Sequence, residues 1–253
     1  MDWQEGEIIY IDKPYRKTSF DVVNKVRWHL CHAIGVKKLK VGHAGTLDPL
    51  ATGVMIVCTG HATKRIEEFQ YHTKEYVANI RLGATTPSFD LEKEIDAYYP
   101  TEHITRPMVE EVLTNFLGTI EQVPPTYSAC KVDGVRAYDM ARKGKEVELK
   151  PKKLVIDEIE LLDYTLPDIT LRVVCSKGTY IRALARDIGE ALHSGAHLTG
   201  LRRTRVGNVT VGDCIKLEDF PDWLAAQSFE KAMKPTTDEQ TKNQEASHGL
   251  ACL

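Results

Sequence analysis

Segments with the two-residue period of a β-strand follow one another in this chain with no helical pattern between them. In residues 74–83 (KEYVANIRLG) the even-numbered positions from 76 to 82 are all apolar, which is typical of a half-buried strand. Residues 153–164 and 168–175 form two more strand segments, separated only by Leu166-Pro167. Strands joined so closely must run antiparallel, because a parallel pair needs a long crossover. We therefore expect an α+β fold with a mixed, largely antiparallel central sheet and flanking helices.

Three segments have the apolar spacing and the end signals of helices. In residues 18–35, Thr18 and Asp21 resemble a capping box and Gly35 is a helix stop. Residues 105–118 have Thr105 as a candidate N-cap and close on a glycine, and residues 179–192 are amphipathic. Other expected elements are strands within 6–13, 54–59 and 197–212, a turn at Asp133-Gly134, and short helices within 136–144 and 217–229.

The composition is that of an ordinary globular protein, with 42% apolar and 27% charged residues among 253. No apolar run approaches the roughly 18–20 residues needed to cross a bilayer, and the N-terminus lacks a secretory signal pattern. Six cysteines occur without a C-x-x-C pair, which favours reduced thiols and a cytoplasmic location. From about Lys234 the sequence is polar and unpatterned, and we expect a mobile tail.

The formal net charge is −3, but cations gather in residues 177–205. That stretch contains Lys177, Arg182, Arg186, Arg202, Arg203 and Arg205 against only two acids. Two interpretations are open at this point. The cations form either a solvated charged face or a surface that contacts nucleic-acid phosphates, because phosphate contacts depend on where cations lie rather than on total charge.

The segment GHAGTLDPLATG, residues 42–53, surrounds one carboxylate, Asp48, with three glycines. One interpretation is a turn in which Asp48 bonds backbone N–H groups. The other is a loop that presents a nucleophilic carboxylate, which would need a cationic partner to hold and aim it. Arg182 is the first candidate for that partner and Arg186, one helical turn later, the second. His43 has no companion ligands at useful spacing, so we expect no metal site.

Phosphate-binding glycine loops and the common serine or cysteine nucleophile motifs are missing from the sequence. Six segments, in the same order along the chain, resemble the characteristic blocks of TruB-type tRNA pseudouridine synthases. They are IDKPYRKTSFDVV (11–23), GHAGTLDPLATGVMIVCTGHATK (42–64), KEYVANIRLGATT (74–86), QVPPTYSACKVDGVRAYDMARKGKEVE (122–148), CSKGTYIRALARDIGEAL (175–192) and AHLTGLRRTRVG (196–207). Together they cover most of residues 5–220, which makes the resemblance far more specific than one motif.

The resemblance implies isomerisation of uridine to pseudouridine in tRNA, at position 55 of the T-arm, on a flipped-out nucleotide and without a cofactor or metal. It implies that Asp48 is the nucleophile, attacking either ribose C1′ or ring C6. It further implies that Tyr76 stacks on the base or acts as a general base, and that Arg182 pairs with the aspartate. His43, Tyr180 and Leu201 are implied to bind substrate. By the same resemblance, the residues expected at the RNA backbone are Lys64, Lys177, Arg202, Arg203 and Arg205.

The sequence also departs from the family pattern. Ala44 replaces the usual threonine, and the segment TTPSFDLEKEI keeps Asp90 but loses its neighbouring Asp-Thr and glycine. We expect a catalytic domain over residues 1–220. Residues 221–253 are expected to form a short helix and a disordered tail, with the PUA-type RNA-binding domain of many relatives absent or vestigial.

These observations predict a monomeric, cytoplasmic enzyme that acts on the tRNA T-arm stem-loop without a membrane or an obligate protein partner. Two alternatives stay open. One is an RNA-binding or tRNA-folding module whose catalysis is secondary or lost. The other is a synthase that acts on a different RNA site.

Overall fold

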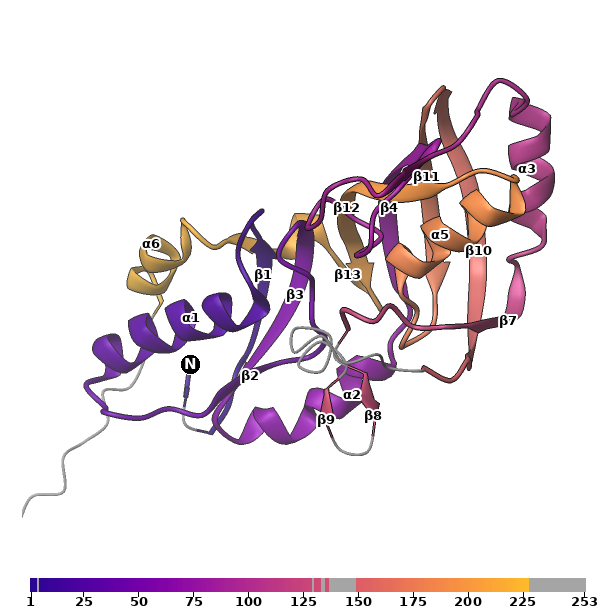
Figure 1. The fold of residues 1–253 in the computed structure, drawn as a ribbon. Helices are drawn as coiled ribbons and strands as arrows, with labels where there is room; N and C mark the ends of the chain where they lie inside the picture. The colour runs from indigo at the N-terminus through magenta and orange to yellow at the C-terminus, as the bar shows by residue number, and fades with distance from the viewer. Residues whose placement is uncertain (4, 129, 133–134, 137–148, 228–253) are drawn as a thin grey trace, which may run out of the picture.

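The computed structural model describes residues 1–3, 5–128, 130–132, 135–136 and 149–227 (Figure 1). Its strands are β1 Ile8–Lys13, β2 Val41–His43, β3 Ala51–Thr59, β4 Lys74–Leu82, β5 Ala84–Thr85, β6 Ala97–Tyr98, β7 Gly118–Gln122, β8 Lys131–Val132, β9 Val135–Arg136, β10 Lys152–Thr165, β11 Asp168–Cys175, β12 Ala196–Val206, β13 Val209–Thr210 and β14 Ile215–Lys216. Its helices are α1 Ser19–Ile34, α2 Ile66–Tyr71, α3 Arg106–Thr114, α5 Ile181–Ala191 and α6 Phe220–Ala225, with short 3₁₀ turns at Gly60–Arg65 and Val211–Asp213.

One ten-stranded sheet forms the frame of the described structure, in the order β14-β1-β3-β12-β4-β11-β10-β7, with β2 and β13 paired off this path. Most neighbours are antiparallel, whereas β12 runs parallel to β3 and β1 runs parallel to β14. The expected α+β fold with a mixed, largely antiparallel sheet and flanking helices is confirmed. The parallel pair β3–β12 brings the two segments Ala51–Thr59 and Ala196–Val206 together at the middle of the sheet.

Two groups of helices cover different parts of the sheet (Figure 1). Helices α3 and α5 pack with β4, β10 and β11 around a core that includes Ile80, Leu171 and Leu184. Helices α1 and α6 pack with β1 and β3 around a second core that includes Val26 and Phe220. The candidate site lies along β3 and β12, where these two helix-covered parts of the sheet meet.

Strand β3 is buried on both faces, which explains its unbroken apolar run. Met55 and Val57 belong to the core under α1, whereas Val54, Ile56 and Cys58 belong to a third core with Phe69 of α2. Strand β4 instead keeps the predicted alternation, since its even-numbered residues are buried and the residues between them are partly or fully exposed. The period of each strand therefore follows the number of layers packed on it.

The predicted helix ends are mostly where the sequence puts them. Thr18 and Asp21 form the capping box of α1, and Gly35 closes it in the left-handed conformation. Thr105 accepts the N-cap hydrogen bond of α3, but that helix ends at Thr114 and the glycine at 118 instead starts β7. The segment between β5 and α3 contains the short strand β6. The predicted turn at 133–134, most of the helix at 136–144 and the tail lie outside the described residues.

Candidate active site

The loop that carries Asp48 leaves β2 and returns as β3. Gly45 and Gly53 hold it with φ values of +120° and +106°, which side-chain-bearing residues rarely adopt. Gly53 also has no room for a side chain, because an added Cβ would lie 2.1 Å from the carbonyl oxygen of Arg203 on β12. Gly45 and Gly53 therefore permit the turn, and Gly53 also permits the close approach of β3 and β12.

Asp48 and Arg182 form an ion pair at the end of this loop. Arg182 Nε lies 2.9 Å from Asp48 Oδ2, and the arginine side chain is only 6% exposed, whereas the Asp48 side chain is 37% exposed. Arg182 sits in the first turn of α5, behind the carboxylate as seen from solvent. The pair therefore presents one negatively charged group to solvent and keeps its cation inside.

Arg182 is fixed by more than Asp48. Its guanidinium donates to the backbone oxygens of Ser88 at 3.2 Å and Tyr127 at 3.0 Å. Its Nε also lies 3.6 Å from Oδ2 of Asp90, a buried carboxylate on the loop between β5 and β6. One arginine therefore connects three loops that are distant in the sequence, and these contacts fix the position of its guanidinium.

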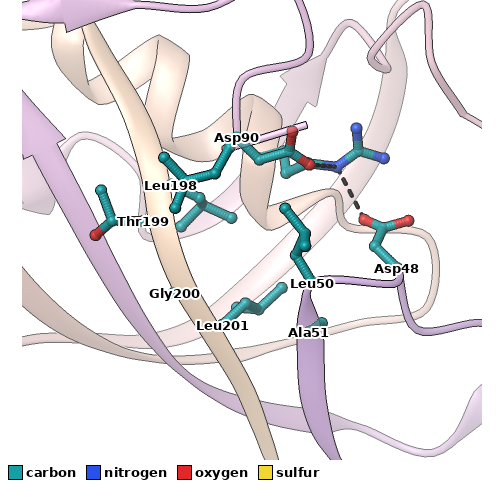
Figure 2. Close-up of a pocket in the computed structure, with 10 residues that line it drawn as sticks. Asp48, Leu50, Ala51, Asp90, Leu198, Thr199, Gly200 and Leu201 are labelled. Atoms are coloured by element: carbon teal, nitrogen blue, oxygen red, sulfur yellow. Dashed lines mark ion pairs between the residues drawn. The ribbon is translucent and has the colours of Figure 1, made fainter. Parts of the chain in front are cut away.

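A pocket opens beside this ion pair (Figure 2). It is open to solvent, contains about 290 Å³ of empty space, and has Asp48, Asp90 and Arg182 at one end. The remaining lining comes from the residue after Asp48-Pro49, the start of β3, the loop after Asp90 and the middle of β12, namely Leu50, Ala51, Leu91, Leu198, Thr199, Gly200 and Leu201. An apolar wall facing a fixed charged pair is the general form of a small-molecule or base-binding site.

Of the two predicted tyrosines, Tyr76 is buried in the core next to the site, on β4. Burial raises its pKa, while the nearby Arg203 guanidinium acts in the opposite direction. Tyr180 is the N-cap residue of α5 and is half-buried, with its backbone N–H donating to Gln122 Oε1 at 2.9 Å. Burial also raises the Tyr180 pKa, against a hydrogen bond with Ser128.

His43 is the last residue of β2, at the start of the Asp48 loop. Burial lowers its pKa, and the charge of Arg203 lowers it further, so the imidazole is neutral near pH 7. Among the residues that the structure describes, no three His, Cys, Asp or Glu side chains gather in a way that could hold a metal ion.

The predicted RNA-contacting role of Arg203 does not fit its position. Arg203 is 2% exposed, its Nε donates to Val54 O at 2.7 Å, and a terminal nitrogen donates to Gly45 O at 3.2 Å. Its place on β12 between Gly53 of β3 and Tyr76 of β4 buries it at the centre of the sheet. Arg203 therefore holds the Asp48 loop from inside the protein.

The other predicted cations lie nearer the surface. Arg202 pairs with Asp12 at 2.8 Å, Arg205 lies 3.4 Å from Glu75, and the Lys177 ammonium sits 4.0 Å from the centre of the Tyr71 ring. Lys64 is exposed. Arg186, the second candidate partner of Asp48, pairs instead with Asp187 at 2.6 Å.

Sequence reasoning missed two residues that support the loop from behind. Ser19 Oγ donates to Leu47 O at 3.0 Å and accepts from Leu47 N at 2.9 Å. The buried Lys13 ammonium donates to the carbonyl oxygens of Pro14 at 3.0 Å and Pro49 at 3.3 Å. Both residues lie in the segment IDKPYRKTSFDVV, but only tertiary contacts connect them to Asp48.

Comparison with known proteins identifies the family of this chain. The TruB family pseudouridylate synthase N-terminal domain matches residues 32–181. The chain belongs to the TruB family. In this TruB-family chain the tRNA pseudouridylate synthase B C-terminal domain matches residues 182–237.

Curated relatives agree over nearly their full length. A tRNA pseudouridine synthase B of Phocaeicola vulgatus is 72% identical over 92% of this chain and 99% of that protein. A tRNA pseudouridine synthase B of Flavobacterium johnsoniae is 50% identical over 88% of this chain and 98% of its own. The TruB-family chain is thus an isomerase that converts uridine to pseudouridine in tRNA.

Solved structures share the fold. A Cbf5-Nop10-Gar1 complex matches with a TM-score of 0.65 and 30% identity over 88% of this chain and 56% of that chain. An H/ACA RNP bound to a substrate RNA containing 2′-deoxyuridine matches with a TM-score of 0.62 and 29% identity, over 88% of this chain and 54% of that chain. The TruB-family chain thus spans little more than half the length of these two proteins. No described helix is both long and apolar enough to cross a membrane.

Proposed function

We propose that this chain isomerises uridine 55 in the T-arm of tRNA with Asp48 as the nucleophile. The observation that carries the proposal is the ion pair at the pocket, in which Asp48 is accessible and Arg182 is buried 2.9 Å behind it. A carboxylate attacks carbon only while ionised and correctly aimed, and a fixed guanidinium provides both conditions.

The reaction leaves the atoms of the nucleotide unchanged. The bond between ribose C1′ and uracil N1 breaks, the uracil turns, and a bond forms between C1′ and ring C5. The proton on C5 then leaves to a base, and N1 regains a proton. Asp48 supplies the transient covalent bond, to either C1′ or C6, and is regenerated when the new bond has formed. The protein needs no redox partner for this exchange because no electrons are gained or lost.

The apolar lining beside a fixed charged pair suits a single base turned out of its stack. Flipping costs a few kcal/mol, which contacts in the pocket must offset. We propose that Leu201, which lines the pocket, packs on the base. Tyr76 and Tyr180 are not among the residues that line the pocket, and we propose that they contact the uracil from beside it, with stacking on Tyr76 contributing about 1–3 kcal/mol. Because burial raises the pKa of Tyr76, its phenol is protonated near neutral pH and acts as a base only after losing that proton.

The RNA around the target nucleotide requires contacts outside the pocket. We propose that His43, neutral at the start of the Asp48 loop, hydrogen bonds RNA near the vacated position. Lys64, Lys177, Arg202 and Arg205 remain proposed backbone contacts. The domain limits at 220, the monomeric state and the cytoplasmic location stay predictions.

The test compares the wild type with Asp48→Asn on an unmodified tRNA transcript. Pseudouridine is mapped along the whole transcript by chemical modification and primer extension, and tRNA binding is measured in parallel. We expect the variant to form no pseudouridine and to bind with wild-type affinity, because the amide keeps the shape of the side chain. Asp168→Asn, which changes an exposed carboxylate paired with Arg81, is the matched control and keeps activity.

Each alternative predicts a different result. A chain that only binds or folds tRNA shows no change in either measurement. A synthase for another site forms pseudouridine elsewhere in the transcript. That result would keep the role of Asp48 as nucleophile but would refute the assignment to position 55. Product formation by Asp48→Asn at the wild-type rate would overturn the proposed role of this aspartate.

A further inference from the structure

The outer face of helix α1 combines exposed aromatic rings with a high density of positive charge. Val22, Val26 and Leu30 on the inner face are buried, whereas Phe20 is 65% and Trp28 is 56% exposed on the outer face. Large exposed rings close to exposed cations make this face a candidate binding surface.

The segment from Tyr15 to Lys40 is the most basic part of the chain that the pocket does not use. It contains Arg16, Lys17, Lys25, Arg27, Lys37, Lys38 and Lys40 against the single acid Asp21, a formal charge of +6 in a chain whose net charge is −3. Arg27 is held by Asn24 and by the backbone oxygen of Val41. Lys25, Lys37 and Lys38 are exposed.

The one acid on this face already has partners. Asp21 accepts from the backbone N–H of Thr18 at 2.8 Å, which completes the helix cap, and hydrogen bonding with the Thr18 side chain and then with its backbone lowers the Asp21 pKa. Its charge is already included in the formal charge of +6, so residues 15–40 as a segment create a positive potential. Such a potential attracts a polyanion and disfavours the mixed-charge surface of an ordinary protein partner.

The start of α1 is joined to the active-site loop. Ser19, at the first position of α1, holds Leu47 next to the nucleophile, and the backbone N–H of Arg16 donates to Pro49 O at 2.9 Å. From there α1 extends away from β1 and β3 (Figure 1). Its 16 residues correspond to about 24 Å of helix length. Helix α1 is therefore anchored at its start to the loop that carries the nucleophile.

The rings are arranged for stacking. Trp28 already packs on His32, with ring centroids 4.1 Å apart, and its backbone oxygen lies 2.7 Å from His32 Nδ1. His29 meets the edge of the same indole at a centroid distance of 4.6 Å. These contacts fix the indole plane while much of the ring stays exposed, which is the arrangement that binds an unpaired base by stacking.

We propose that the outer face of α1 and the following Lys37-Lys38 segment form a second RNA-binding surface. This surface binds the substrate tRNA outside the target nucleotide. Lys25, Lys37 and Lys38 contact phosphates, and Phe20 and Trp28 pack on exposed bases. The proposal depends on tRNA being the substrate and not on the roles assigned to the pocket residues.

The first experiment measures the affinity for an unmodified tRNA transcript across a range of KCl concentrations. The variant Lys25→Gln/Lys37→Gln/Lys38→Gln is expected to bind about tenfold or more weakly at 100 mM salt. The slope of log affinity against log salt should fall by about 2, because fewer counterions are released on binding. The control Arg81→Gln/Arg106→Gln/Lys153→Gln removes the same charge from exposed positions on β4, α3 and β10 and should bind like the wild type. Equal affinities for the two triple variants would overturn the proposal.

The second experiment tests the rings. Phe20→Ser/Trp28→Ser is expected to weaken tRNA binding several-fold with an unchanged salt slope and only a small loss in the free energy of unfolding, because the Trp28 contacts with His29 and His32 are lost. Tyr98→Ser on β6 should leave tRNA binding unchanged. Loss of folding stability with normal tRNA binding would show that another segment or a second copy of the chain covers the face, and the proposal would fall. At saturating tRNA both sets of variants should convert uridine at the wild-type rate, so this result is separable from any failure of Asp48→Asn.

Discussion

Ser19 and Leu47 form a reciprocal pair of hydrogen bonds across 28 residues of sequence. The serine hydroxyl donates to the leucine carbonyl oxygen at 3.0 Å and accepts from the leucine N–H at 2.9 Å. Both residues are buried, and Leu47 precedes the proposed nucleophile directly. The first turn of α1 therefore fixes the backbone from which Asp48 projects.

Ser19→Ala is expected to reduce both stability and turnover. The change leaves a buried N–H and a buried C=O unpaired, which costs about 1–3 kcal/mol of the free energy of unfolding. It also frees the backbone beside Asp48, so kcat should fall at least several-fold while KM changes less. Urea unfolding and single-turnover kinetics provide the two measurements.

Ser194→Ala is the matched control for this variant. Ser194 is also buried and donates to Pro100 O at 3.0 Å, but it lies outside the Asp48 loop. It should lose stability to a similar or smaller extent and keep kcat. If the two variants had the same kcat at matched fractions of folded protein, Ser19 would be important only for folding.

Arg182→Lys is expected to abolish most of the activity although the charge is kept. Lysine has a single ammonium and cannot reach Asp48 and the backbone oxygens of Ser88 and Tyr127 together. We expect kcat to fall by about 100-fold or more, in line with the loss of one fixed electrostatic group in an active site. Arg186→Lys, one turn along α5, should retain near-normal kcat because Arg186 pairs with Asp187. A normal kcat for Arg182→Lys would mean that charge alone is sufficient.

The local elements of the fold could be predicted because their determinants are local. The capping box at Thr18 and Asp21 specifies the start of α1, and the alternation in residues 74–83 specifies which side of β4 is buried. The end of α3 was missed by a few residues because Gly118 serves the start of β7 rather than the helix. The parallel pairing of β3 with β12 has no signal in either strand, and it decides where the site lies.

In the candidate site, too, some features could be predicted from the sequence and others depend on tertiary contacts. The residues themselves indicate Arg182 as the first candidate partner of Asp48, the resemblance to TruB-type synthases implies the same pair, and the structure puts the two side chains 2.9 Å apart. The basic run at 202–205 looked like one surface, but a strand points alternate residues to opposite faces, and Arg203 is buried at the sheet centre. Lys13 and Ser19 carry no catalytic signature, and they matter only through contacts with backbone atoms of the loop.

Gly53→Ala is expected to disrupt the junction of β3 and β12. The added Cβ would overlap the Arg203 carbonyl oxygen at 2.1 Å, and the residue would keep a φ of +106°. We expect a loss of more than about 3 kcal/mol in the free energy of unfolding, because strain and steric overlap add. Gly35→Ala is the control, since Gly35 has a φ of +71° with nothing within 4 Å of the new atom. It should cost only about 1–2 kcal/mol, and equal losses would refute the close-approach argument.

Arg203→Met and Arg202→Met should affect different properties. Arg203→Met leaves the buried carbonyl oxygens of Val54 and Gly45 without their donor, at a cost of about 1–3 kcal/mol for each. Arg202 is 40% exposed in its ion pair with Asp12, so Arg202→Met should cost about 1 kcal/mol or less. We expect Arg202→Met instead to weaken tRNA binding and to reduce its salt dependence. Thermal unfolding and tRNA titration distinguish the two variants. Weaker tRNA binding by Arg203→Met with normal stability would show that Arg203 contacts RNA after all.

Lys13 is expected to make the stability of the protein depend on pH in the alkaline range. Burial lowers its pKa from 10.5 to about 8, although the Asp48 charge acts in the opposite direction. Between about pH 8 and 10.5 the unfolded chain therefore binds more protons at this position than the folded chain does. The free energy of unfolding must then receive a contribution that increases with pH across this window.

Lys13→Met removes this contribution, so its stability should rise less steeply, or fall more steeply, from pH 8 to 10 than that of the wild type. Lys74 has the same direction of shift, to about 8, chiefly because of burial. Lys74→Met should therefore flatten the curve as well, and the double variant should flatten it further. Urea unfolding at four pH values across the window measures these slopes. Parallel curves for the wild type and Lys13→Met would show that the ammonium keeps its proton in the folded state, held by the carbonyl oxygens of Pro14 and Pro49.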